Sequence, residues 1–164
     1  MIYEKIPGAF SVGKVMVWAA CGFNGQVGLA FSDGRQNSPK YIETLENHLM
    51  PFAENIGRRN WEYQHDNAPT HTSSATKNYL NSKNVTVFEW PRISPDLNSI
   101  ENVWGIISRK VFGNGGQFYS VNALKTSIES AWYNLESEIL QTLIMTMEKR
   151  VYNVLLRNGK TLNY

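Results

Sequence analysis

Hydrophobic residues in the first fifty positions follow the pattern of a β-hairpin and then of a helix. One apolar run covers residues 15–21 and stops at a Phe-Asn-Gly turn, and a second covers residues 27–31. Two short runs joined by such a turn predict two paired strands. Ser38 is then the expected N-cap of a helix, with Pro39 as its first residue, and Pro51 is expected to kink or divide it. Apolar positions recur at helical spacing along this segment: Tyr41, Leu45, Leu49 and Phe52.

Short strands and helices alternate through the middle of the chain. Apolar and polar residues alternate from residue 61 to residue 66, which predicts a strand. A polar helix is expected over residues 71–83 and a second strand over residues 85–90. The loop PRISPDLNS then leads into a helix with one apolar face: Ile100, Val103, Trp104, Ile107 and Val111.

The last fifty residues predict helices without strands. A glycine-rich loop, GNGGQ at 113–117, separates them from the preceding part. The first helix has an apolar face made of Val121, Leu124, Ile128, Trp132 and Leu135. The second has a longer one made of Leu140, Leu143, Ile144, Met147, Val151 and Leu155. We therefore divide the chain into a mixed α/β region, residues 1–113, and a helical extension of the same domain, residues 114–164.

Composition restricts the class of protein without deciding its function. With 164 residues, 42% of them hydrophobic and 18% charged, the chain can form one compact core and is not expected to be disordered. Its formal net charge is only +2, so a nucleic-acid partner would have to be held by a local basic patch. Cys21 is the single cysteine, which excludes an intrachain disulfide and favours a reducing compartment. No apolar run approaches the roughly 20 residues of a membrane span, so no membrane partner is expected.

Two carboxylates lie where an α/β fold of this kind collects ligands. Asp66 ends the predicted strand 61–66, and ligands bind at the carboxyl ends of strands in open α/β sheets. Glu101 lies in the first turn of the helix that follows the last strand, at the border of its apolar face. Gly105, one turn further along, leaves space beside it. The two acids are far apart in sequence, but a fold that joins this strand to this helix can bring them together.

Converging carboxylates suit metal-dependent phosphoryl transfer. A pair of divalent ions about 3.5 to 4 Å apart activates the nucleophile and stabilises the leaving oxygen. Oxygen ligands without cysteine favour Mg²⁺ or Mn²⁺. From spacing alone, structural roles are the commoner explanation: Asp66 as a turn residue, and Glu101, three residues after Asn98, as part of a capping box.

Four longer segments resemble the C-terminal catalytic half of Tc/mariner-type transposases. They read VMVWAACG at 15–22, FSDGRQNSPKYIETLENHLMPF at 31–52, HDNAPTH at 65–71 and WPRISPDLNSIENVWG at 90–105. The resemblance covers essentially the whole chain and implies an RNase H-like α/β fold, with a mixed sheet flanked by helices. In that family the last two motifs hold the second aspartate and the glutamate of a DDE triad. The resemblance therefore implies Asp66 and Glu101 as catalytic residues and metal ligands.

The same resemblance implies a function and its partners. The intact family enzyme uses Mg²⁺ or Mn²⁺ to hydrolyse phosphodiester bonds at transposon ends, and the freed 3′-hydroxyl then attacks target DNA. DNA is accordingly the implied partner and the nucleus the implied location. A homodimer is the implied assembly of the intact transposase.

The sequence departs from the family pattern before residue 15. The family's first catalytic aspartate lies on a strand that precedes the VMVWG-like strand, whereas residues 1–11 contain no aspartate. Asp33 is not a substitute, because the FSDG stretch has no metal-binding role in the family and Asp33 is expected to form a turn with Gly34. We therefore expect a chain without the first strand and the helix-turn-helix region, and inactive by itself. The alternatives are a non-catalytic remnant that binds nucleic acid or protein, and a nuclease of the same fold.

Other candidate residues have simpler explanations. His65 and His71 flank Asp66, but their separation across a turn is poor for zinc, and a structural role beside the carboxylate is expected. Trp104 and Trp132 are expected to pack in the core. Basic side chains could touch phosphates, although solvated helix faces explain most such residues. They are Arg58, Arg59, Arg109, Lys110, and a basic side of the last helix formed by Lys149, Arg150, Arg157 and Lys160.

Overall fold

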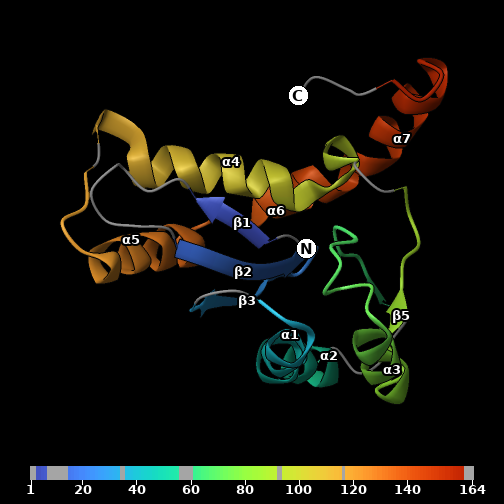
Figure 1. Cartoon of the computed structure of the whole chain (residues 1–164). Helices are drawn as coiled ribbons and strands as arrows, with labels where there is room; N and C mark the ends of the chain where they lie inside the picture. The colour runs from blue at the N-terminus through green and yellow to red at the C-terminus, as the bar shows by residue number, and fades with distance from the viewer. Residues whose placement is uncertain are drawn as a thin grey trace.

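Helices cover both faces of a three-stranded antiparallel sheet (Figure 1). The structure, a computed structural model, describes residues 3–6, 15–33, 36–55, 61–91, 94–115 and 117–160. The sheet has the order β1-β2-β3 and is formed by β1 (Tyr3–Ile6), β2 (Val15–Gly22) and β3 (Gly25–Ser32). A second, smaller sheet pairs β4 (Glu62–Tyr63) in parallel with β5 (Thr86–Val87).

Strands β2 and β3 form the hairpin that the two apolar runs predict. Val17 pairs with Phe31, and the register shifts between Ala20 and Cys21. Gly25 closes the turn with a φ of 124°, which residues with a side chain rarely adopt. The turn therefore requires glycine at this position.

The expectation of a chain without the first strand was wrong, because β1 precedes β2 and pairs with it. β1 pairs antiparallel with β2 on the edge opposite β3, with Glu4 opposite Val17 and Ile6 opposite Val15. Because unpaired backbone groups in a largely buried strand are costly, a short N-terminal segment that satisfies them stabilises the sheet.

The helix after the hairpin has three parts. α1 (Ser38–Thr44) continues into a π-helical turn, η1 (Leu45–Leu49), and then α2 (Met50–Asn55). The Met50 N–H donates to the Leu45 carbonyl, and this wider turn lies immediately before Pro51, where a division was expected. The predicted cap is off by one residue: Asn37, not Ser38, accepts the Lys40 N–H with its side chain at 3.0 Å.

The segment around Asp66 contains less strand than predicted. Only Glu62–Tyr63 of the predicted strand 61–66 and only Thr86–Val87 of the predicted 85–90 form ladder pairs. His65 makes other contacts instead, because its carbonyl accepts the indole N–H of Trp90 at 2.8 Å. The polar helix α3 (Ser74–Ser82) begins three residues later than expected, after the N-cap Ser73.

The helix that carries Glu101 agrees with its predicted pattern. A 3₁₀ turn, η2 (Pro95–Leu97), leads to the N-cap Asn98 and then to α4 (Ser99–Phe112). Its buried residues are the predicted set: Ile100, Val103, Trp104, Ile107 and Val111. After a further 3₁₀ turn, η3 (Gly113–Gly115), α5 (Val121–Tyr133) packs Trp132 against Trp104 with ring centroids 6.2 Å apart.

The last predicted helix is in fact two. α6 (Ser137–Met145) ends before Thr146, and α7 (Met147–Leu156) begins directly after it. Leu140 is buried as expected, but Val151 is 45% and Leu155 70% exposed. The prediction of one continuous buried stripe was therefore wrong.

Alternate side chains of β2 enter two separate cores, as the period of a strand requires. One core lies between the sheet and α4, α5 and α6: Val15, Val17, Ala19, Leu29, the five buried residues of α4, Leu124, Ile128, Trp132, Leu135 and Leu140. The other lies on the opposite face, toward α1 and α3: Trp18, Ala20, Tyr41, Leu45, Leu49, Met50, Tyr63, Leu80 and Val85. In the part of the chain that the structure describes, no helix has the length and apolar character to span a membrane.

Candidate functional site

Asp66 lies in a tight turn three residues after β4. Its Oδ1 accepts the backbone N–H of Ala68 at 2.9 Å, and Asn67 between them has a φ of 61°. Asparagine is one of the few residues with a side chain that adopts this backbone readily. The turn-forming role is therefore real, and it also fixes the direction of the carboxylate.

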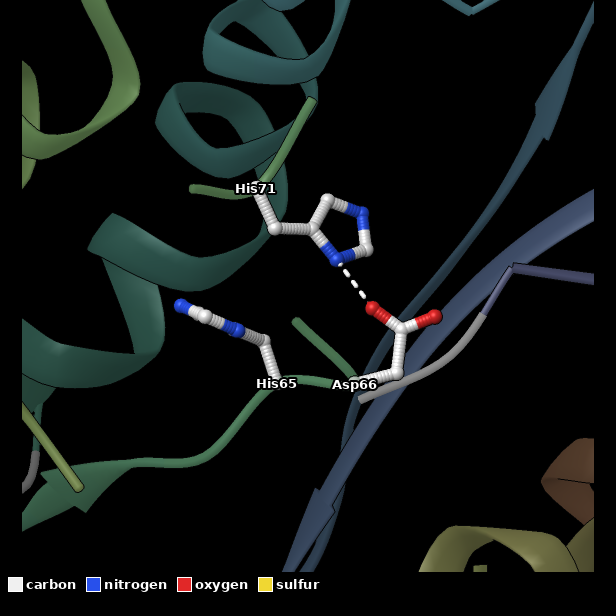
Figure 2. A group of neighbouring side chains, drawn as sticks. All are labelled: His65, Asp66 and His71. Atoms are coloured by element: carbon white, nitrogen blue, oxygen red, sulfur yellow. Dashed lines mark hydrogen bonds and ion pairs between the residues drawn. The ribbon is translucent and has the colours of Figure 1, made fainter. Parts of the chain in front are cut away.

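His71 holds the same carboxylate oxygen from the other side. Its Nδ1 lies 2.5 Å from Oδ1 of Asp66, and Figure 2 shows the second oxygen pointing away from the imidazole. The His71 side chain is fully buried, whereas that of Asp66 is 25% exposed. The His71 ring also stacks on Tyr41 of α1 with centroids 4.2 Å apart. Helix α1 therefore supports His71, and His71 in turn holds the Asp66 carboxylate, which remains accessible.

Electrostatics favour the ionised form of Asp66. Burial alone would raise the pKa of this carboxyl, but the hydrogen bond and charge of His71 and the Ala68 N–H outweigh it and lower the pKa below its usual value. An ionised oxygen donor at the end of a strand is the form that a divalent cation requires.

His65 behaves as a neutral structural residue. Burial, with the nearby His71, lowers the pKa of His65 to about 4. Its Nδ1 accepts the Asn67 N–H at 3.1 Å, and in Figure 2 its ring points away from Asp66. Ligand atoms of His65, Asp66 and His71 lie within 4.8 Å of one another, a spacing that would allow a metal ion. Nδ1 of each histidine already takes part in a hydrogen bond, which agrees with the structural role expected from the sequence.

Glu101 occupies the third position of α4, after the N-cap Asn98. Asn98 accepts the Ile100 N–H with its side chain at 3.3 Å, and its own N–H donates to the Pro95 carbonyl at 3.1 Å. A capping box would instead offer that N–H to the Glu101 carboxylate. The Pro95 carbonyl is therefore one acceptor of the Asn98 N–H.

A hydrogen bond connects the segments that carry the two acids. The Gln64 side chain, two residues before Asp66, donates from Nε2 to the Leu97 carbonyl, four residues before Glu101, at 3.4 Å. The end of β4 and the start of α4 are therefore neighbours. That Asp66 and Glu101 meet at one ion stays a prediction.

The donors present suit the cation that the motif implies. Asp66 offers an ionised carboxylate with one oxygen directed away from its hydrogen-bond partner, and Glu101 offers a half-buried second carboxyl. Oxygen donors of this kind, without a thiolate, fit Mg²⁺ or Mn²⁺ better than zinc.

The remaining candidates lie apart from this site. Asp33 has a 96% exposed side chain, 3.6 Å from Lys125 of α5, and Gly34 lies outside the described residues, as do Arg58 and Arg59. Most of the predicted basic residues are exposed: Arg109, Lys110, Lys149, Arg157 and Lys160. Arg150 is the exception, because it is buried instead of belonging to a solvated basic side. Sequence reasoning missed this, and the only available signal was an arginine within an otherwise apolar spacing.

Sequence comparisons identify relatives along nearly the whole chain. The family described as DDE superfamily endonuclease matches residues 11–125. The chain is 34% identical over 155 residues to the Transposable element Tc3 transposase of Caenorhabditis elegans, covering 94% of this chain and 47% of that protein. It is 33% identical over 153 residues to the Tcb1 transposase of Caenorhabditis briggsae, covering 93% and 55%. The chain spans about half the length of the curated relatives it matches.

Solved structures with the same fold come from a mariner transposase. The catalytic domain of Mos1 mariner transposase superposes with a TM-score of 0.85 at 20% identity, over 99% of this chain and 82% of that one. A structure of that domain with raltegravir and Mg gives 0.82 at 19% identity, over 92% and 78%. A Mos1 paired-end complex with the left transposon end gives 0.81 at 21% identity, over 92% and 45%. The predicted RNase H-like fold is thus confirmed.

Proposed function

Because this chain belongs to the DDE superfamily endonuclease family, we propose that it supplies the catalytic core of a Tc/mariner-type transposase. The intact protein would hydrolyse phosphodiester bonds at transposon ends and join the freed 3′-hydroxyl to target DNA. One observation carries the proposal to this site: an ionised, accessible Asp66 carboxylate is fixed by His71 and Ala68 beside the start of the helix that carries Glu101.

The described residues divide the chemistry between them. Asp66 and Glu101 would hold Mg²⁺ or Mn²⁺, and His71 positions Asp66 without touching the ion. When bound, such an ion activates the attacking oxygen and stabilises the charge that develops on the phosphate. Two carboxylates alone form a weak site, since Mg²⁺ keeps several waters unless the phosphates of the substrate assist. A third carboxylate is therefore part of the proposal for the intact protein.

The partners follow from the same assignment. DNA, both transposon ends and target, is the proposed substrate, and the paired-end complex of the Mos1 relative supports this choice. We propose a homodimer for the intact transposase and a nuclear location, because its substrate is chromosomal DNA.

The test compares DNA cleavage by two proteins. One is the chain of residues 1–164, and the other is extended upstream by a segment that supplies a further aspartate. We expect Mg²⁺-dependent cleavage of transposon-end DNA only by the longer protein, and its loss in Asp66→Asn and in Glu101→Gln. Glu62→Gln, an exposed carboxylate on β4, is the matched control and should remain active.

Two results would overturn the assignment. Cleavage that survives both Asp66→Asn and Glu101→Gln would show that these residues are not the metal ligands. A longer protein that binds transposon ends and Mn²⁺ but never cleaves would instead support the non-catalytic remnant.

A further inference from the structure

Helix α7 is attached to the rest of the fold by an arginine. Arg150 is the buried residue of this helix, with 5% of its surface exposed. Three apolar neighbours on the same helix face solvent instead: Tyr152, Leu155 and Leu156 are 60–70% exposed. The helix packs against η2 and α6, and the buried Arg150 makes a polar contact with η2.

The Arg150 guanidinium connects η2 to the first turn of α4. Its Nη1 donates to Oδ1 of Asn102 at 2.6 Å and to the carbonyl of Asp96 in η2 at 3.3 Å. Asn102 directly follows Glu101, and Asp96 precedes the N-cap Asn98. The two acceptors therefore enclose the turn on which Glu101 is presented.

Stability alone does not explain a buried arginine here. Desolvating a guanidinium is costly, and well-packed apolar residues commonly stabilise such a position more. α7 has apolar side chains available, yet the one it buries is Arg150. A planar, permanently charged fork with several donors is suited to fixing the relative orientation of two acceptors.

We propose that Arg150 is a positioning residue for the metal site, which holds the first turn of α4 so that Glu101 faces the ion. The inference rests on the proposed function, because it requires Glu101 to be a metal ligand. Arg150 lies outside the segment 11–125 that the family matches, so α7 adds a support to the catalytic core from the C-terminal extension. Groups that orient metal ligands from behind typically change metal affinity 10- to 100-fold when removed.

The experiment follows Mn²⁺ binding at single residues of the 164-residue chain. Paramagnetic broadening of backbone amide resonances is measured during a Mn²⁺ titration, for residues 66 and 101 separately. In Arg150→Met, the Mn²⁺ concentration that half-broadens residues 66 and 101 should rise about tenfold at both, because the two residues report the same ion. Arg150→Lys should recover part of the effect, and Arg157→Met, an exposed arginine of the same region, should behave as the wild type.

Asn102→Ala provides a second route if Arg150→Met does not fold. It removes the acceptor instead of the donor, and its effect should not add to that of Arg150→Met in the double variant. Leu140→Ala, a buried change in α6, tests whether lost stability alone moves the titration, and it should not.

The outcomes distinguish the positioning role of Arg150 from the proposed function. If Asp66→Asn and Glu101→Gln weaken Mn²⁺ binding but Arg150→Met and Asn102→Ala lower only the melting temperature, the positioning role is wrong and the proposed function stands. If Asp66→Asn and Glu101→Gln leave Mn²⁺ broadening unchanged, the proposed function fails and the positioning role fails with it.

Discussion

His71 Nδ1 lies 2.5 Å from Oδ1 of Asp66, so a fully buried imidazole fixes a carboxylate that is itself open to solvent. The stack of His71 on Tyr41 connects this pair to α1, and the Tyr41 hydroxyl in turn lies 2.5 Å from that of Tyr63 on β4. A series of contacts therefore runs from Tyr63 through Tyr41 and His71 to Asp66, the candidate metal ligand.

Removal of the His71 ring should release the Asp66 carboxylate. In His71→Ala the pKa of Asp66 should rise, because burial then opposes ionisation without the hydrogen bond that offsets it. His71→Asn, whose amide can take the place of Nδ1, should raise the pKa less. Titration of the Asp66 carboxyl carbon by NMR measures both. An unchanged pKa in His71→Ala would mean that the Ala68 N–H alone holds the carboxylate.

His65 should make the fold sensitive to mild acid. Its pKa in the folded chain is about 4, below the ordinary value of 6.5, because burial disfavours the charged ring. The unfolded chain therefore takes up the proton first, and the contribution of neutral His65 is complete above about pH 6.5 and is lost as the pH falls toward 4. A shift of this size corresponds to about 3 kcal/mol in the free energy of unfolding.

Urea unfolding at several pH values tests this sensitivity. His65→Asn keeps an acceptor for the Asn67 N–H but does not titrate, so its stability should fall less than that of the wild type between pH 6.5 and 4. Parallel pH profiles for the two proteins would assign the acid sensitivity to other groups.

The sequence predicts this fold well where one face of an element is buried. The apolar face of α4 and the β2–β3 hairpin follow directly from periodicity, because both bury their residues at the spacing of the element. Periodicity does not predict the bounds of the short strands β4 and β5. The apolar-polar alternation runs from residue 61 to residue 66, although only Glu62 and Tyr63 of this segment pair with β5. Side-chain contacts such as Trp90 with the His65 carbonyl end the ladder there, and no local pattern encodes them.

The proposed ligands were chosen from the sequence alone, whereas the contacts that support them were not foreseen. HDNAPTH and SPDLNSIEN locate Asp66 and Glu101 because each motif is local in the chain. The Arg150–Asn102 contact joins residues 48 positions apart, and His71–Asp66 depends on the conformation of a turn. Contacts of these kinds are set by tertiary packing, which a single sequence does not specify.

Zinc should bind this chain only weakly. A zinc ion at His65, Asp66 and His71 would bind rings that already take part in hydrogen bonds through Nδ1. Calorimetric titration should therefore show no stoichiometric binding at micromolar Zn²⁺. Tight binding that disappears in His71→Ala would instead assign the three residues to a zinc site.

The two C-terminal helices should contribute unequally to stability. Leu140 of α6 is 1% exposed and lies in the core with β2 and α4, whereas Leu155 of α7 is 70% exposed, although both belong to the same apolar spacing in the sequence. Leu140→Ala should lower the free energy of unfolding by about 2 to 4 kcal/mol, because it leaves a cavity, and Leu155→Ala should change it by less than about 0.5 kcal/mol. Chemical denaturation measures both differences. A loss above about 1.5 kcal/mol for Leu155→Ala in the dilute chain would mean that α7 buries this side chain against the fold in solution, which would remove the reason for attaching the helix through Arg150.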